Sequence, residues 1–360
     1  MTEREYRQRR ARLQQKLEEA GLDALLVFSP ANIRYLSGFT GSNGLLLAGG
    51  EDALLITDPR YEIQAAGQAK CRVKIARGPL LKAVPPALRR MGAGRAGFES
   101  LHIRYAAYRA LAASVPARIR LRPAEGLVEE LRMVKSAAEI ARIRASMQTC
   151  EAAFTAAIRH ARPGVTEAEL AAEFDYQMRK RGAERPAFDT IVASGPRSAL
   201  PHAEPSAKPL RANELLLVDM GAQQDGYASD MTRMAWLGKP GRKAVRLHRA
   251  VLEAQLAALD HVRAGRSVAA VDRLARQVLK AHALAGYFTH ATGHGLGLEI
   301  HEAPRLGRGE RRRLEAGMVI TIEPGVYMER FGGIRIEDTV VVTESGCENL
   351  TRIPKELIEL

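Results

Sequence analysis

Hydrophobic and polar positions alternate along the first third of the chain in a way that predicts strands and helices by turns. The short apolar runs LDALLVF, NGLLLAG and DALLITD are separated by turn-forming residues, as expected of buried strands. RYEIQAAGQAK and YAAYRALAASV, further along, have the character of helices. Because strands that alternate with helices are typical of α/β domains, we expect an α/β domain over residues 1–126.

The pattern changes after residue 126. A long helical stretch covers residues 127–160, and capping boxes predict helix starts at Ser136 and Thr166. From residue 188 onward the chain is rich in strand patterns, with two further helices near residues 243–263 and 267–285. This mixture predicts a second domain of the α+β type over residues 127–360.

Composition agrees with a folded protein of two domains. The chain has 360 residues, of which 46% are hydrophobic and 26% charged, so it can bury a large core. No apolar run approaches the roughly 18 residues of a membrane span, and the start of the chain lacks the apolar core of a secretory signal. The three cysteines lie far apart and suggest no disulfide framework, which fits the cytoplasm.

The net charge of +13 is carried mainly by arginines that are scattered over the predicted helices. We interpret them as a solvated surface rather than a nucleic-acid site, because they form only short runs. We therefore expect neither a nucleic-acid nor a membrane partner.

Two acidic residues mark the first candidate site. LLLVDMGAQQDGYASDMTRMAWL contains two apolar strands around a turn-forming centre, which predicts a hairpin. A turn centred between Gln224 and Asp225 would place Asp219 directly opposite Asp230. Like charges that face each other across a ladder are destabilising unless something positive lies between them. A divalent cation would meet that need.

A second acidic pair follows near the end of the chain. VITIEPG and GGIRIEDTVVV bracket a loop, and a hairpin that is symmetric about Arg330 brings Glu323 opposite Glu337. Four carboxylates suit a hard or borderline divalent metal. His294, framed by glycines in THATGHGLGLEIHE, would complete the donor set, since glycines permit close backbone approach.

Each of these residues has an ordinary structural explanation when taken alone. A single Asp or Glu on a strand is usually solvated, and a single His is usually just a satisfied polar residue. The combination of two facing acidic pairs with a glycine-framed histidine favours a metal site. Two other motifs carry no function: G-x-G-x-x-G at residues 92–97 follows a helix instead of a strand, and His301-Glu302 lacks the second histidine of a zinc-protease motif.

These residues resemble the metal site of the pita-bread metallopeptidases, which include methionine aminopeptidase, aminopeptidase P and prolidase. The ordered set matches all five ligands of that family's dinuclear site: Asp219, Asp230, His294, Glu323 and Glu337. The resemblance covers nearly the whole chain, and residues 1 to about 125 are similar to the creatinase-type N-terminal domain. It implies a creatinase-like α/β domain followed by a pita-bread catalytic domain, and a homodimer.

The resemblance also implies cofactors and roles. Two divalent metal ions would be manganese, with cobalt or zinc able to substitute. Glu323 would act as general base and acid besides binding metal, and His202 and His301 would act in catalysis. The residues that line the substrate site would be His290, Tyr327 and Arg335.

The implied reaction is hydrolysis of short peptides with proline in the second position, by a hydroxide held between the two metals. The N-terminal motifs FTGS and TDPRY favour aminopeptidase P, which releases the residue before proline. Xaa-Pro dipeptidase (prolidase) is the alternative, because the compact length is common among bacterial prolidases. A non-catalytic binding module or chaperone is a remote alternative, since such relatives usually lose metal ligands.

Overall fold

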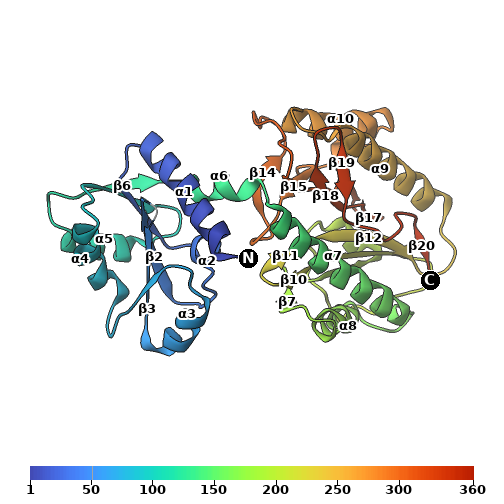
Figure 1. Cartoon of the computed structure of the whole chain (residues 1–360). Coiled ribbons are helices and arrows are strands. Elements are labelled where there is room, and N and C mark those ends of the chain that lie inside the picture. Colours follow the sequence, from blue (N-terminus) through green and yellow to red (C-terminus); the bar gives the residue numbers. More distant parts are fainter. Residues whose placement is uncertain (51) are drawn as a thin grey trace. The chain divides into compact units, whose positions relative to one another are not determined.

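The computed structural model describes residues 1–50 and 52–360, and its contacts divide the chain into two compact units (Figure 1). The first unit is Met1–Arg132 and the second is Met133–Leu360. Within the described ranges, no helix combines the length and apolar character needed to cross a bilayer.

The first unit is built on one six-stranded sheet with the strand order β4-β3-β2-β1-β5-β6. The central strand β1 pairs antiparallel with β2 and parallel with β5, so the sheet is mixed. The strands are β1 (Ala24–Val27), β2 (Gly44–Gly49), β3 (Asp52–Thr57), β4 (Arg72–Ile75), β5 (Arg95–Glu99) and β6 (Arg120–Ala124). The alternation predicted for this part of the chain is confirmed.

Helices connect these strands and pack against them around an apolar core that includes Leu26, Leu47 and Ile56. The α-helices are α1 (Glu3–Glu19), α2 (Pro30–Ser37), α3 (Glu62–Gln68), α4 (Val84–Arg90), α5 (Tyr105–Ser114) and, running past the division between the units, α6 (Leu127–Met133). Two 3-10 helices accompany them, η1 (Pro59–Tyr61) and η2 (Leu80–Ala83). Gly92 ends α4 with a positive φ of 68°, so the glycine-rich motif at residues 92–97 is a helix stop that leads into β5.

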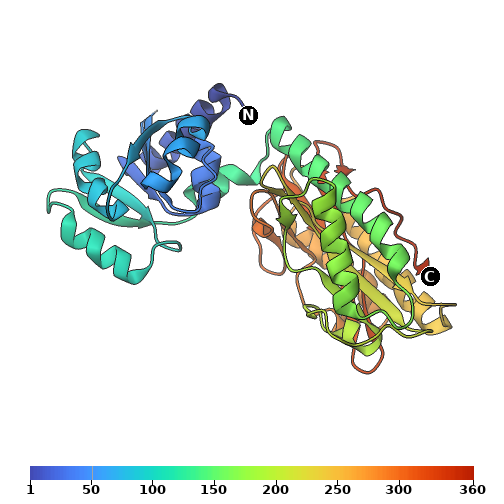
Figure 2. The ribbon, with the colours of Figure 1, turned by 90° about the horizontal axis from the view of Figure 1, so that it is seen from below.

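The second unit places pairs of helices on opposite sides of its strands (Figures 1 and 2). One pair is α7 (Ala137–Ala157) with α8 (Glu167–Lys180), and the other is α9 (Arg242–His261) with α10 (Val268–Ala281). Both predicted capping boxes are present: the side chains of Ser136 and Thr166 each accept a hydrogen bond from the backbone N–H of the glutamate three residues on, whose carboxylate accepts one from the backbone N–H of the serine or threonine. The 3-10 helices are η3 (Ile158–His160), η4 (Gly195–Ala199) and η5 (Ala285–Tyr287).

Four small sheets lie between these helices. Their strand orders are β20-β12-β9-β8, β14-β13-β15-β18-β19, β11-β10-β7 and β16-β17. The strands are β7 (Arg185–Pro186), β8 (Ile191–Ser194), β9 (Leu215–Met220), β10 (Ala222–Gln224), β11 (Tyr227–Ala228), β12 (Met231–Trp236), β13 (Gly293–Gly295), β14 (Glu302–Leu306), β15 (Val319–Ile322), β16 (Gly325–Met328), β17 (Gly332–Arg335), β18 (Asp338–Val342), β19 (Cys347–Asn349) and β20 (Ile358–Glu359).

The register of the first hairpin corrects one prediction. Asp219 pairs with Thr232 rather than with Asp230, because the turn is centred between Asp225 and Gly226. Both of these turn residues have positive φ, 48° and 76°, which a two-residue hairpin turn of this type requires. Asp225 and Gly226 adopt positive φ at little steric cost, whereas a turn centred on Gln224-Asp225 would require positive φ at a glutamine.

The second hairpin has the predicted symmetry. The ladders β16–β17 and β15–β18 are both centred on Arg330, whose φ is 67°. Each side of the hairpin is interrupted, however, so that Glu323 and Glu337 lie in the breaks between consecutive strands. These two glutamates therefore do not lie within a continuous strand ladder.

Candidate metal centre and active-site cavity

A cavity of about 690 Å³ in the second unit collects the predicted site residues. All five metal-ligand candidates line it, as do His202, His290, His301 and Arg335. Tyr327 is absent from the lining and lies behind His290 and Arg335, with its hydroxyl in contact with both.

The five donors come from strands that are far apart in sequence. Asp219 is in β9, and Asp230 immediately precedes β12. His294 is the middle residue of β13, whose glycines are sterically required. A Cβ atom at Gly293 would lie 1.9 Å from the Thr321 carbonyl oxygen, and one at Gly295 would lie 2.3 Å from that of Ala303. The glycine frame that the sequence suggested therefore has a physical cause.

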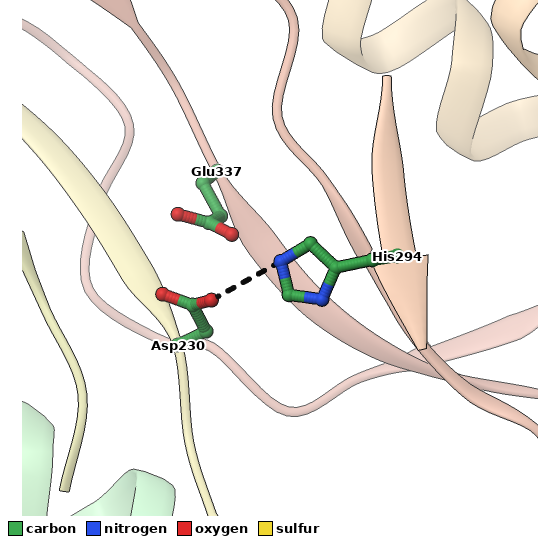
Figure 3. A group of neighbouring side chains, drawn as sticks. All are labelled: Asp230, His294 and Glu337. Atoms are coloured by element: carbon green, nitrogen blue, oxygen red, sulfur yellow. Dashed lines mark ion pairs between the residues drawn. The ribbon is translucent and has the colours of Figure 1, made fainter. Parts of the chain in front are cut away.

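Three donors already converge closely enough to share one ion (Figure 3). The ligand atoms of Asp230, His294 and Glu337 lie within 4.8 Å of one another. Nε2 of His294 is 3.5 Å from Asp230 and 3.4 Å from Glu323. Its Nδ1 is 3.0 Å from the Gly295 carbonyl oxygen, which requires the proton on Nδ1 and leaves the Nε2 lone pair for a metal.

Two carboxylates each keep one oxygen without a partner. Asp219 accepts a hydrogen bond from Arg335 on Oδ2, and Glu337 accepts one from Thr232 on Oε2 at 2.7 Å. Among the described residues, Oδ1 of Asp219 and Oε1 of Glu337 are buried and have no hydrogen-bond partner. Buried polar atoms are nearly always satisfied, so these two oxygens fit a cation that the protein is built to receive.

The acidic side chains also repel one another. Burial, followed by the charges of Asp219 and Glu323, raises the pKa of Asp230 well above its ordinary value. Burial, followed by the charge of Asp230, does the same to the pKa of Glu337. Arg335, which pairs with Asp219, does not balance this excess of negative charge. Divalent cations would, and a donor set of four carboxylates and one imidazole suits them.

Hydrogen bonds and burial determine the orientation and the pKa of the histidines around the donors. His290 contacts the Ala291 carbonyl oxygen through Nδ1 at 2.7 Å and the Tyr327 hydroxyl through Nε2 at 2.8 Å. Burial lowers the pKa of His290 and, together with the nearby His294, lowers that of His301. Burial raises the pKa of Tyr327 to about 12, so its hydroxyl stays protonated at neutral pH. His202 follows η4 and lies exposed at the cavity wall.

Sequence reasoning missed several residues of this site. Thr232 and Thr321 support the donors: Thr321 donates to Glu323 at 3.2 Å and accepts from the backbone N–H of His294 at 3.0 Å. Both threonines lie two positions from a candidate ligand, a spacing that puts side chains on one face of a strand and could have revealed them. Arg305 also lines the cavity, but no comparable spacing from a candidate ligand marks it in the sequence.

Comparison with known proteins agrees with this fold, which is that of a two-domain metallopeptidase. Residues 141–344 match the model of metallopeptidase family M24, and residues 9–134 match the creatinase/prolidase N-terminal domain. The chain therefore belongs to metallopeptidase family M24, a family of hydrolases that use divalent metal ions. The predicted creatinase-like N-terminal domain and pita-bread catalytic domain are confirmed.

Individual relatives resemble the chain over almost its full length. A Pyrococcus furiosus protein named Xaa-Pro dipeptidase is 33% identical, covering 98% of this chain and 100% of the relative. The structure of an Xaa-Pro dipeptidase from Bacillus anthracis superposes with a TM-score of 0.96 at 39% identity, covering 99% and 100% of the two chains. That of an X-Pro aminopeptidase from Thermotoga maritima gives 0.90 at 35% identity, covering 96% and 100%.

Proposed function

We propose that this chain is an Xaa-Pro dipeptidase (prolidase) that holds two divalent metal ions in the second unit. The observation that carries the proposal is the convergence of five donor side chains in one cavity, with unpartnered oxygens on Asp219 and Glu337. The dipeptidases of Pyrococcus furiosus and Bacillus anthracis support the substrate class. This choice reverses the preference for aminopeptidase P that the N-terminal motifs indicated.

Each donor has a proposed place. Asp230 and Glu337 would bind both ions, His294 with Glu323 would bind one of them, and Asp219 would bind the other. Manganese suits this set best, because oxygen donors predominate and one imidazole completes them. When bound, the ions lower the pKa of a water molecule toward neutrality and polarise the scissile carbonyl.

The protein's own residues would move the proton and hold the substrate. The prolyl nitrogen must gain a proton before it can leave, and Glu323 would take that proton from the attacking water and deliver it. Glu323 is suitably placed, since its carboxylate faces the cavity and Thr321 orients one of its oxygens. His202 and His301 would donate hydrogen bonds to the carbonyl oxygen as negative charge develops on it.

Arg305 supports a dipeptidase over an aminopeptidase. A dipeptide presents a free carboxylate on its proline, whereas a longer peptide continues there as an uncharged amide. Arg305 lines the cavity and, in the part of the chain that the structure describes, makes no ion pair, in contrast to Arg335. We propose that its guanidinium binds the proline carboxylate. Aminopeptidase P is the second candidate, favoured by the Thermotoga maritima structure and the FTGS motif.

The test compares Leu-Pro with Leu-Pro-amide, which lacks the carboxylate, on manganese-loaded protein. Arg305→Met should raise KM for Leu-Pro about 10- to 100-fold, the usual cost of losing a hydrogen bond between charged groups, and leave the amide unaffected. Arg308→Met, a change at an exposed arginine just past the end of β14, is the control. Wild-type protein that prefers the amide, with no effect of Arg305→Met on Leu-Pro, would favour aminopeptidase P.

The predicted cytoplasmic location and homodimer stay predictions that rest on composition and on the family resemblance. The same holds for manganese over cobalt or zinc.

A further inference from the structure

The segment that leads into the metal-ligand candidate His294 is held by a buried ion pair on α10. Residues Phe288–Thr292 belong to no helix or strand, so their backbone groups need other partners. Arg276 of α10 donates to the carbonyl oxygen of Phe288 at 3.1 Å and to that of His290 at 2.5 Å. Its guanidinium also stacks 4.2 Å from the Phe288 ring.

Asp272, one turn earlier in α10, completes this contact. Both of its oxygens accept hydrogen bonds from Arg276, at 2.8 and 3.0 Å, and Oδ1 also accepts from the backbone and hydroxyl of Thr292. We call Asp272 and Arg276 the α10 clamp. The clamp therefore binds both ends of the segment that carries His290.

The segment connects the α10 clamp to one half of the candidate metal centre. The Thr292 carbonyl oxygen accepts a hydrogen bond from the backbone N–H of Glu323 at 2.8 Å. His294 follows two residues later, and the Phe288 and His290 rings make a T-shaped contact with their centroids 5.1 Å apart. The two donors reached in this way, His294 and Glu323, are those proposed to share one ion. Asp219 and Asp230 are supported from other strands.

Stability does not explain the clamp. Asp272 is 1% exposed and is the charged member of the buried face of α10, which otherwise consists of Val268, Val271, Ala275 and Leu279. A buried ion pair is often no more stabilising than apolar residues of similar volume, because both charges lose their hydration. Its geometric effect, the placement of a segment without regular structure, is therefore the better explanation.

We propose that Asp272 and Arg276 are positioning residues that set the backbone of His294 and Glu323, and so the affinity for one of the two metal ions. The inference rests on the proposed dinuclear site. Loss of the clamp should weaken binding of the ion held by His294 and Glu323 and leave binding of the ion held by Asp219 almost unchanged.

The experiment is a manganese titration of metal-free full-length protein by calorimetry, with thermal unfolding of the metal-free state measured alongside. Arg276→Met leaves the Asp272 charge buried and unpaired, so it should lower the melting temperature as well as the affinity. The double variant Asp272→Asn/Arg276→Met removes both charges and should recover most of the melting temperature. It still lacks the hydrogen bonds from Arg276 to the carbonyl oxygens of Phe288 and His290, so its affinity for one ion should stay about 10-fold or more below wild type.

The control is Arg249→Met on α9, which breaks an exposed pair of the same i,i+4 spacing with Glu253 and should change neither quantity. If Arg276→Met does not fold, the double variant carries the test. The proposed role of the clamp would be overturned if the double variant bound both ions with wild-type affinity, or if its affinity for both ions fell equally. Wild-type protein that binds no manganese would instead count against the dinuclear site itself.

Discussion

Three residues of the candidate centre, Asp219, Glu337 and His294, divide their polar atoms between the protein and the cavity. One carboxylate oxygen of Asp219 is held by Arg335 and one of Glu337 by Thr232, while the second oxygen of each is left without a partner among the described residues. His294 follows the same rule with its two nitrogens. Fixing one atom of a ligand orients the other, which is how surrounding groups tune metal sites.

His202 gives the clearest prediction at this scale. It lines the cavity without being a proposed metal ligand, so His202→Ala should lower kcat about 100- to 1,000-fold, as expected for loss of a hydrogen bond to the transition state. Metal content, measured by elemental analysis, should be unchanged. His160→Ala, a change at an exposed histidine in the same unit, is the control. Parallel loss of metal and activity would mean that His202 has a structural role.

Much of the site could be predicted at the residue scale because ligand chemistry demands particular side chains. Four acids on apolar strands and a glycine-framed histidine are unusual enough to be noticed in sequence. Arg305 could not be found this way, since its place depends on how β14 follows β13. The register of β13 and β14 shifts between His294 and Gly295, and no local sequence pattern predicts such a shift.

The two hairpins show that sequence patterns predict strands well but do not determine their register. Apolar runs on either side of a turn or loop correctly predicted both hairpins, and the symmetry about Arg330 was right. The register of the first hairpin was wrong by one position at the turn, because positive φ at Asp225 and Gly226 decides where the chain reverses. A register is a property of two strands and their turn together, so a single strand's pattern does not determine it.

Helix α9 carries a prediction about pH. His248 on this helix is 6% exposed, its Nε2 has no hydrogen-bond partner among the described residues, and burial lowers its pKa. The unfolded chain takes up this proton near pH 6.5, above the folded-state pKa. The unfolded state therefore binds more protons between these two values, and the free energy of unfolding should fall as the pH drops below about 6.5.

Urea unfolding of metal-free protein at a series of pH values measures this effect. His248→Leu should remove part of the decline on the acid side, whereas His160→Leu, at an exposed position, should leave it unchanged. Equal pH slopes in wild type and His248→Leu would show that other groups cause the decline.

For the whole molecule, charge is distributed unevenly between surface and interior. The chain is basic overall, with a net charge of +13, yet its second unit gathers the four candidate ligand carboxylates in one cavity. The net charge gives no indication of this acidic centre, which the spacing of particular residues predicts instead. The fold class, by contrast, could be predicted well, since alternation of elements and capping boxes are local signals that tertiary packing did not override.

The most direct test of metal-dependent dipeptidase activity is product analysis by mass spectrometry with Leu-Pro and Arg-Pro-Pro as substrates. Metal-free protein is compared with protein loaded with manganese, and the manganese content per chain is determined on the same samples. A dinuclear Xaa-Pro dipeptidase should release leucine and proline from Leu-Pro only when it holds two ions per chain, and it should cleave the tripeptide more slowly. Protein that holds two ions and leaves Leu-Pro intact, or metal-free protein that cleaves it equally fast, would contradict the proposed function.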